Sequence, residues 1–377
     1  MDDRLNSLDR LNQLGRLNQL NRLNPLDRRQ FLGGMLGAFL LTGCGRSGGA
    51  GHSLNILSWA DYLHPDTIPE FEKRYSVKVI YDTFASNEAL LSKLQAGGTK
   101  YDIIVPSSYM VKQLKKLDIL SEIDHERVKL FANLMERFQN PSFDPGLKHC
   151  IPYTWGTTGL GFNRKVLGEK GFSFGKERLS WEVFWDKRLS QRMTLLDDGR
   201  EVIGMSLKRH GHSYNTTDEE KMRPAIDDLK VQKPLTMCYT SDQVIVELSS
   251  GDSYLSQVFS GDAFQARRSN SDVAYHIPKE GASIWSDNFC IPRTAPHPDN
   301  AYLWLNYLLE KEVASACANF THYATANAAA FPLVDSELKD DPNLYPPESV
   351  LSTCEDLKDI GAAVFTYDRL WTELKCS

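Results

Sequence analysis

Short apolar runs alternate with stretches of helical periodicity in this chain, and this alternation constrains the fold more than any other feature. Residues 54–59, 77–81 and 101–105 are short apolar runs and are predicted to be strands. Between them, residues 65–75 and 87–94 have the apolar spacing of helices. Strands and helices that alternate in this way predict an α/β protein with a mainly parallel sheet covered by helices.

The rest of the chain predicts a second domain of the same kind. Residues 151–163 are extended and rich in glycine, which suits a strand that crosses between two domains, and a second α/β series follows over residues 180–277. Residues 285–291 are predicted to cross back, and residues 300–320 and 348–374 are predicted to be helical. A chain of 377 residues with 41% apolar content can bury two cores of ordinary size.

The N-terminal region predicts export and lipid anchoring. Arg28 and Arg29 precede the apolar run 31–41, and the run ends in Leu-Thr-Gly followed by Cys44, which is the order of a twin-arginine signal and a lipoprotein box. The run has about half the length of a membrane-spanning helix. We therefore expect a leader over residues 1–43, a lipidated Cys44 that holds the mature chain to a membrane in the periplasm, and a glycine-rich tether over residues 44–52. A signal anchor or a chance apolar run is the alternative.

Charge and cysteine content exclude several classes of function. The chain has a net charge of −6, and residues 1–43 hold more Arg than Asp, so removing them makes the chain more acidic. An acidic protein is not expected to bind nucleic acid and mildly favours cationic ligands. The cysteines after Cys44 have long, irregular spacings without Cys-x-x-Cys, which argues against zinc and thioredoxin-type motifs. The sequence leaves open whether they are disulfide-bonded or buried thiols; they are Cys150, Cys238, Cys290, Cys317, Cys354 and Cys376.

Candidate binding residues follow two of the predicted strands. Trp59 and Tyr62 come after the first strand, and Ser107 and Tyr109 come after the third. Because ligands of open α/β sheets bind beyond the carboxyl ends of the strands, we expect both groups at one rim of the sheet.

A second candidate is the strand-like run that contains Trp285 and Asp287. Residues two apart in a strand point to the same face, so the indole and the carboxylate project together. This pair can hold an organic ammonium by cation–π attraction and a charge-assisted hydrogen bond. The alternative is an ordinary half-buried strand with a capping Asp.

Asp198 and Glu201 lie where a strand is predicted to give way to a helix, so they are either ligand-binding carboxylates or a variant of the capping box. His210 and His212 end a helical run without a carboxylate or cysteine nearby, so a solvated loop is expected and no metal site is predicted.

Taken together, several ordered segments resemble the spermidine/putrescine-binding proteins of bacterial ABC importers, over residues 54–374. The segments are 59–62, 86–88, 101–109, 151–155, 197–201, 260–264, 278–281, 285–287 and Tyr323. The resemblance implies the type II periplasmic-binding-protein fold, in which two α/β lobes are joined by crossing strands. Lobe I would comprise 53–155 and 286–331, lobe II would comprise 156–285 and 332–377, and the hinges would lie near 153–158 and 283–286.

The resemblance also implies roles for single residues. Aromatic residues would form the walls around the ligand, the Ser107 hydroxyl would contact it, and Asp198, Glu201 and Asp287 would pair with its ammonium groups. Phe259 and Leu357 stand where spermidine binders commonly carry Trp and Gln, whereas Asp262 stands where putrescine binders carry an acidic residue. The implied binding residues are Trp59, Tyr62, Ser107, Tyr109, Asp198, Glu201, Phe259, Asp262, Trp285, Asp287 and Tyr323.

The function implied by the resemblance is capture of spermidine or putrescine and delivery to an inner-membrane ABC permease that is driven by a cytoplasmic ATPase, without catalysis and without a cofactor. The preference between the two polyamines stays open. A receptor for ferric iron or another solute, with Tyr109 and Tyr323 as ligands, is one alternative. An enzyme that uses Asp198 and Glu201 is another, but no nucleophile, base or cofactor motif accompanies them.

Overall fold

The computed structural model describes residues 52–60, 62–84, 86–97, 100–173 and 178–377. Arg28, Arg29, the apolar run 31–41, Cys44 and the tether as far as residue 51 lie outside the described residues. In the part of the chain that is described, no helix is long and apolar enough to cross a membrane.

The first part of the chain forms the predicted parallel sheet. Strand β1 (Ser53–Ser58) pairs in parallel with β2 (Lys78–Thr83) on one side and with β3 (Ile103–Ile104) on the other. Three helices accompany these strands: α2 (Thr67–Tyr75), α3 (Asn87–Ala96) and α4 (Ser108–Lys116). The predicted order of strands and helices is thus confirmed in this region.

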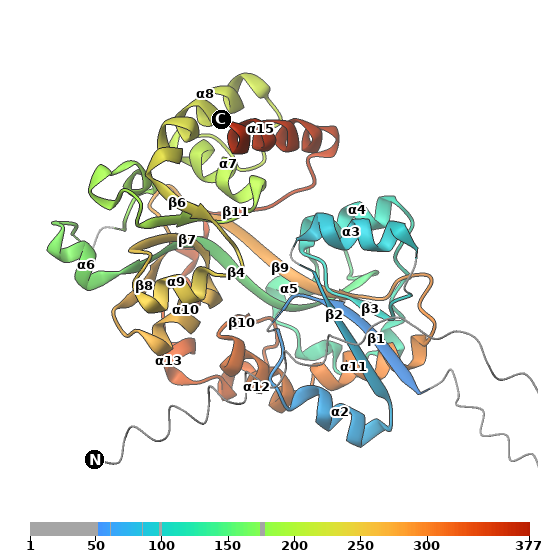
Figure 1. Ribbon diagram of the computed structural model, residues 1–377. Coiled ribbons are helices and arrows are strands. Elements are labelled where there is room, and N and C mark those ends of the chain that lie inside the picture. The colour runs from blue at the N-terminus through green and yellow to red at the C-terminus, as the bar shows by residue number, and fades with distance from the viewer. Residues whose placement is uncertain (1–51, 61, 85, 98–99, 174–177) are drawn as a thin grey trace, which may run out of the picture. The chain divides into compact units, whose positions relative to one another are not determined.

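Two long antiparallel strands connect this region with the rest of the sheet. Strands β4 (Cys150–Asn163) and β9 (Ser283–Cys290) pair from Cys150 opposite Cys290 to Thr157 opposite Ile284, and Figure 1 shows them running side by side through the middle of the fold. The register shifts between Pro152 and Thr154. Proline has no N–H to donate, which suits it to such an irregular point of a ladder.

Beyond Thr157, β4 leaves β9 and enters a second part of the sheet. There it pairs with β7 (Leu255–Phe259) and β8 (Val273–His276), and β7 continues through β5 (Met193–Leu195) to β6 (Thr236–Tyr239). The helices of this part are α7 (Gly199–Arg209), α8 (Glu219–Gln232), α9 (Val244–Ser250), α10 (Ser260–Ser269) and α15 (Val364–Cys376). The resulting strand order is β2-β1-β3-β9-β4-β7-β5-β6.

Two hydrophobic cores form, as the chain length suggested. One contains Leu54, Ile103 and Trp304, and the other contains Trp181 and Phe264. Strand β4 contributes to both, because its first residues pack into the first core and its last residues into the second. This arrangement agrees with the predicted two-lobed α/β fold, while the exact lobe boundaries stay a prediction.

The prediction of helix throughout residues 348–374 is wrong in its middle. Helix α14 (Glu348–Leu351) ends early, and β11 (Glu355–Asp356) then pairs in parallel with the start of β9. Gly361 has a φ of 59°, and its N–H donates to the Asp359 carboxylate before α15 begins. Glycine adopts a positive φ readily, and such a backbone angle interrupts a helix. The turn at this glycine and the pairing of β11 therefore decide the local structure, although the apolar spacing favours a helix.

Residues 300–320 form two helices rather than one, α11 (Pro298–Leu308) and α12 (Lys311–Thr321). The remaining short elements are α5 (Glu136–Gln139), α6 (Arg164–Glu169), α13 (Ser336–Lys339) and β10 (Ala324–Thr325), with 3-10 turns at His125–Arg127, Phe131–Asn133, Trp181–Trp185, Lys187–Leu189, Lys233–Leu235, Phe331–Leu333 and Gly361–Ala363.

Candidate functional site

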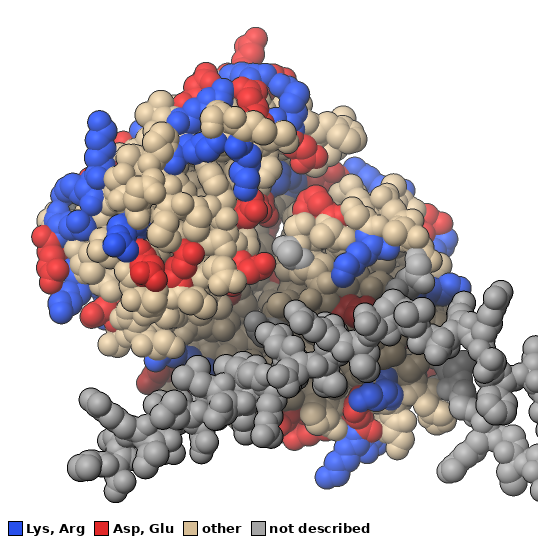
Figure 2. Space-filling view, viewed as in Figure 1, with Lys and Arg blue, Asp and Glu red and all other residues tan. Residues whose placement is uncertain are grey.

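A cavity of about 240 Å³ collects every binding residue that the sequence predicted. In the space-filling view, acidic side chains lie on both sides of a hollow near the middle of this face (Figure 2). The lining residues that the sequence predicted are Trp59, Tyr62, Ser107, Tyr109, Asp198, Glu201, Phe259, Asp262, Trp285, Asp287 and Tyr323. The others are Ala60, Phe84, Asn87, Ser241, Asp242, Ile245, Gln265 and Leu357.

The location of the cavity follows from the sheet. Trp59 comes directly after β1, and Ser107 comes shortly after β3 and is the N-cap of α4. A bridge between Ser107 and Asp287 brings β9 to the same rim. The expectation that the carboxyl ends of β1 and β3 meet at one rim is therefore confirmed.

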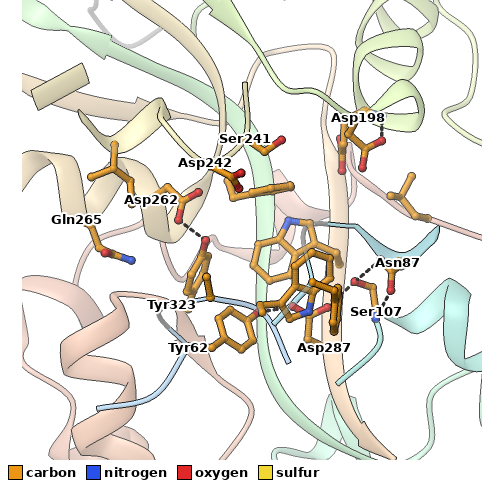
Figure 3. Close-up of a pocket in the computed structure, with 18 of the residues that line it drawn as sticks. Tyr62, Asn87, Ser107, Asp198, Ser241, Asp242, Asp262, Gln265, Asp287 and Tyr323 are labelled. Carbon is orange, nitrogen blue, oxygen red and sulfur yellow. Dashed lines mark hydrogen bonds between the residues drawn. The ribbon is translucent and has the colours of Figure 1, made fainter. Parts of the chain in front are cut away.

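Asp287 is buried at the base of the cavity and is already hydrogen-bonded (Figure 3). The Tyr62 hydroxyl donates to one of its oxygens, and the Ser107 hydroxyl donates to the other at 2.5 Å. Burial raises the pKa of Asp287 to about 6, although both hydrogen bonds act to lower it. Each oxygen keeps a further lone pair, so this carboxylate can still accept a hydrogen bond from a cation.

Asn87 orients the Ser107 hydroxyl, a role that was not predicted for this residue. Its side-chain amide donates to Ser107 Oγ at 3.1 Å, and its amide oxygen accepts from the Ser107 backbone N–H at 3.0 Å. Because Ser107 Oγ accepts a hydrogen bond from Asn87, its own O–H is directed to Asp287. The sequence signal for this role was a polar residue at the start of α3, next to the rim of the sheet.

Aromatic rings surround Asp287. Trp285 packs edge-to-face against Phe259 and Tyr323, with ring centroids 5.7 Å and 5.4 Å apart, and Tyr323 lies 5.6 Å from the ring of Tyr62. A Cβ on Gly156, the partner of Trp285 in β4, would lie 2.5 Å from the indole ring, so only glycine leaves room for the indole there. Such a cluster presents ring faces to methylene groups and cations.

Asp198 is both a helix cap and a cavity residue. It is the N-cap of α7, and its carboxylate accepts hydrogen bonds from the backbone N–H groups of Arg200 and Glu201 at 2.8 Å and 3.1 Å. The capping alternative therefore holds for Asp198, and it does not exclude contact with a ligand because the residue also lines the cavity.

Glu201 lies deeper and makes different contacts. The Thr158 hydroxyl donates to its carboxyl group at 3.0 Å, and the Ser283 hydroxyl lies 2.8 Å from both carboxyl oxygens. Burial, together with the nearby charge of Asp198, raises the pKa of Glu201 to about 8. At neutral pH this carboxyl group is therefore mostly protonated when no cation lies beside it.

Asp262 lies in the first turn of α10 and accepts a hydrogen bond from the Tyr323 hydroxyl (Figure 3). A Cβ on Gly261 would come within 2.3 Å of the Tyr323 ring, so glycine at this position allows the close contact. Tyr109 is held differently, since its hydroxyl donates to Glu88 at 3.1 Å and the Arg200 guanidinium lies 5.9 Å from its ring.

Sequence reasoning missed several polar lining residues besides Asn87. Ser241 and Asp242 lie between β6 and α9, and β6 runs parallel to β5, so the rule of strand carboxyl ends would have pointed to them. Gln265 lies three residues after Asp262 on α10 and so shares its helix face.

The electrostatic character of the cavity favours a cation. Its lining contains the carboxyl groups of Asp198, Glu201, Asp242, Asp262 and Asp287, and among the described residues that line it there is no Lys or Arg. A ligand with several ammonium groups separated by apolar segments fits both the carboxyl groups and the rings.

Comparison with known proteins identifies the family. Residues 66–346 match the family model of the bacterial extracellular solute-binding proteins. The chain belongs to this family. The spermidine/putrescine-binding periplasmic protein of Escherichia coli is 33% identical over 325 residues, which cover 86% of this chain and 92% of the relative. The putrescine-binding periplasmic protein PotF of the same organism is 33% identical over 362 residues, which cover 92% of this chain and 98% of the relative.

Solved structures agree with this family assignment. A putative spermidine/putrescine ABC transporter protein from Listeria monocytogenes superposes with a TM-score of 0.81 at 34% identity, covering 86% of this chain and 99% of that chain. The predicted periplasmic-binding-protein fold is thereby confirmed. The names of these relatives describe transport proteins that bind solutes rather than enzymes.

Proposed function

We propose that this protein captures polyamines, spermidine or putrescine, and delivers them to an ABC import permease. One observation carries the proposal: Asp287 and Trp285 project from β9 into a cavity that also holds four other carboxyl groups and a cluster of aromatic rings. Polyamines are chains of methylenes between ammonium groups, so they need alternating apolar and anionic contacts. The names of the relatives support the same ligand class.

In this proposal each part of the site has a defined role. Asp287 accepts hydrogen bonds from one ammonium group, and Asp198 and Glu201 serve a second one. Six aromatic residues enclose the methylenes, and the Ser107 hydroxyl holds Asp287 in place; they are Trp59, Tyr62, Tyr109, Phe259, Trp285 and Tyr323. Asp262 contacts a terminal amine. Removing water from the closed site strengthens each charge pair and makes an unmatched charge costly, which selects for ligands of matching charge spacing.

Hinged closure of two lobes is part of the proposal, with hinges near 153–158 and 283–286. It is supported by β4 and β9, whose two ends pack into different hydrophobic cores. Binding between two lobes that close is a common device of such receptors. Small-angle X-ray scattering with and without saturating spermidine tests it, and identical profiles would contradict closure.

The cellular location is proposed from the N-terminal sequence. Arg28 and Arg29 support twin-arginine export, and Cys44 supports a lipid anchor that keeps the protein in the periplasm close to the membrane permease subunits and their cytoplasmic ATPase. The relatives are named periplasmic proteins. Cys44→Ser is expected to release the protein from membranes or to block its processing. Unchanged membrane association with an intact leader would contradict the anchor.

The ferric-iron alternative has less support. Iron ligation by Tyr109 and Tyr323 needs deprotonated phenols, but burial raises the pKa of both hydroxyls well above the usual value, and each hydroxyl donates a hydrogen bond to a carboxyl group. Tryptophan, which is prominent in the cavity, does not bind iron.

Isothermal titration calorimetry decides between the two functions. The chain without residues 1–43 and with Cys44→Ser is titrated with putrescine, cadaverine, spermidine, spermine and ferric citrate. Micromolar or tighter binding, about −8 kcal/mol, is expected for at least one polyamine. Binding of ferric citrate without binding of any polyamine would overturn the proposed function.

A further inference from the structure

Cys150 and Cys290 lie directly opposite each other on two neighbouring antiparallel strands. Cys150 is the first residue of β4, Cys290 is the last residue of β9, and the two are register partners. Both side chains are fully buried, and both thiols are free in this structure.

The backbone hydrogen bonds show which type of pair this is. The N–H of Cys150 donates to the Asp144 carboxylate at 3.1 Å, so it points away from β9. On β9, the N–H of Asn288 donates to the carbonyl of Pro106 at 3.0 Å, so the N–H groups of Asn288 and Cys290 face β3 rather than β4. Cys150 and Cys290 are therefore a non-hydrogen-bonded pair.

This type of pair has the spacing that a disulfide needs. In non-hydrogen-bonded antiparallel pairs the Cα atoms are about 4.5 Å apart and the side chains approach closely. Disulfides span Cα separations of about 4.4 to 6.8 Å. The two sulfurs also lie close enough for burial and their mutual contact to raise the pKa of the Cys150 thiol.

The other cysteines in the described chain make different contacts. Cys238 faces the Glu247 carboxylate at 3.6 Å, and Cys317 lies 3.4 Å from the Thr67 hydroxyl. Cys354 follows α14 and contacts the carbonyl of Val350 in that helix. Cys376 is exposed near the C-terminus.

We propose that Cys150 and Cys290 form a cross-strand disulfide when the protein folds under oxidising conditions. The thiolate of one cysteine attacks a sulfur of a small-molecule disulfide such as oxidised glutathione, forms a mixed disulfide and releases one thiol. The second cysteine then attacks the protein sulfur and releases the second thiol. The protein gives up two electrons, and the two protons of its thiols end on the released thiols. Because both cysteines are buried in the native state, the exchange takes place during folding or opening of the strands.

The disulfide would stabilise the fold without changing the cavity. It would tie β4 to β9 in the first hydrophobic core and close a long loop, which restricts the unfolded chain. Residues on β9 alternate between faces, so Cys290 points to the face opposite Trp285 and Asp287. Ligand affinity is therefore expected to be the same in both redox states.

The test compares two refolding conditions. The purified chain without residues 1–43, carrying Cys44→Ser, is unfolded in guanidinium with dithiothreitol and refolded either with dithiothreitol or with reduced and oxidised glutathione. Oxidative refolding is expected to produce a Cys150–Cys290 linked peptide in non-reducing mass spectrometry. The melting temperature is expected to rise by about 10 °C, given the long loop.

A matched pair of variants shows whether the stated pair is responsible. Cys150→Ala is expected to lose both the linked peptide and the rise in melting temperature, whereas Cys238→Ala is expected to keep both. Full alkylation of Cys150 and Cys290 after oxidative refolding would overturn the proposal, and so would linkage of either residue to another cysteine as the main product. If Cys150→Ala does not fold, the peptide map of the parent chain still decides the question.

Discussion

Polyamine binding is expected to release a proton at neutral pH, because Glu201 is mostly protonated before a cation pairs with it. Its pKa is raised to about 8 by burial and by the charge of Asp198. At pH 7 about nine in ten of these carboxyl groups carry a proton, and ionising one costs about 1.4 kcal/mol. An ammonium group that pairs with Glu201 needs the ionised form, so binding must supply this free energy.

The magnitude follows from the same pKa. Raising the pH from 7 to 8 removes most of the cost of ionisation while a diamine such as putrescine keeps both of its charges, so its affinity is expected to increase about fivefold over this range. At pH 7 close to one proton leaves Glu201 for each ligand bound. Asp287 adds a smaller release below pH 7, since its pKa is raised to about 6.

Calorimetry in two buffers with different enthalpies of ionisation measures this release. The difference between the observed binding enthalpies gives the number of protons that the buffer takes up. Glu201→Gln is the matched control, because the amide keeps an acceptor for the Thr158 and Ser283 hydroxyls but cannot titrate. This variant is expected to bind without proton release above pH 7. An affinity of the parent chain for putrescine that is unchanged from pH 7 to 8, with equal enthalpies in both buffers, would refute the reasoning.

Four further predictions concern stability and single residues. The ligand-free protein should lose stability as pH rises from 5 to 8, because the raised pKa of Glu201 means that the folded state binds more protons than the unfolded state. In Glu201→Gln, the melting temperature should depend less on pH. Asp287→Asn should cost about 2 to 5 kcal/mol of binding in calorimetry, and unchanged affinity would disprove the site. Asn87→Ala should move the pH profile of polyamine binding to higher pH, because the Ser107 hydroxyl loses the hydrogen bond that orients it. Leu357→Gln should favour spermidine over putrescine in competition assays, and an unchanged ratio would contradict this.

The strands and helices near the N-terminal end of the described chain could be predicted because their signals are local. Apolar runs and helical spacing predicted β1, β2, α2 and α3 with small errors at their ends. The same reasoning failed around residues 352–363, where β11 pairs with β9 from a distant part of the chain. Strand pairing across such a sequence separation leaves little trace in local periodicity.

The candidate site divides in the same way. Residues that directly follow strands, such as Trp59 and Ser107, and the alternation that places Trp285 beside Asp287, could be predicted because sheet geometry applies to every α/β fold. Asn87 could not be assigned, because its role depends on the position of Ser107 and Asp287 in two other elements.

The sequence by itself determined the α/β class, the residue types of the binding site and the acidic character that favours a cation. Only the tertiary structure decided which carboxyl groups are neutral and which cysteines face each other. Asp287 and Glu201 have raised pKa values because segments far apart in the chain exclude water from them. Most residues of the second core lie between Cys150 and Cys290 in the sequence, and only the pairing of β4 with β9 brings the two cysteines together. Desolvation and strand register both arise from contacts between distant segments, which is why no local pattern contains them.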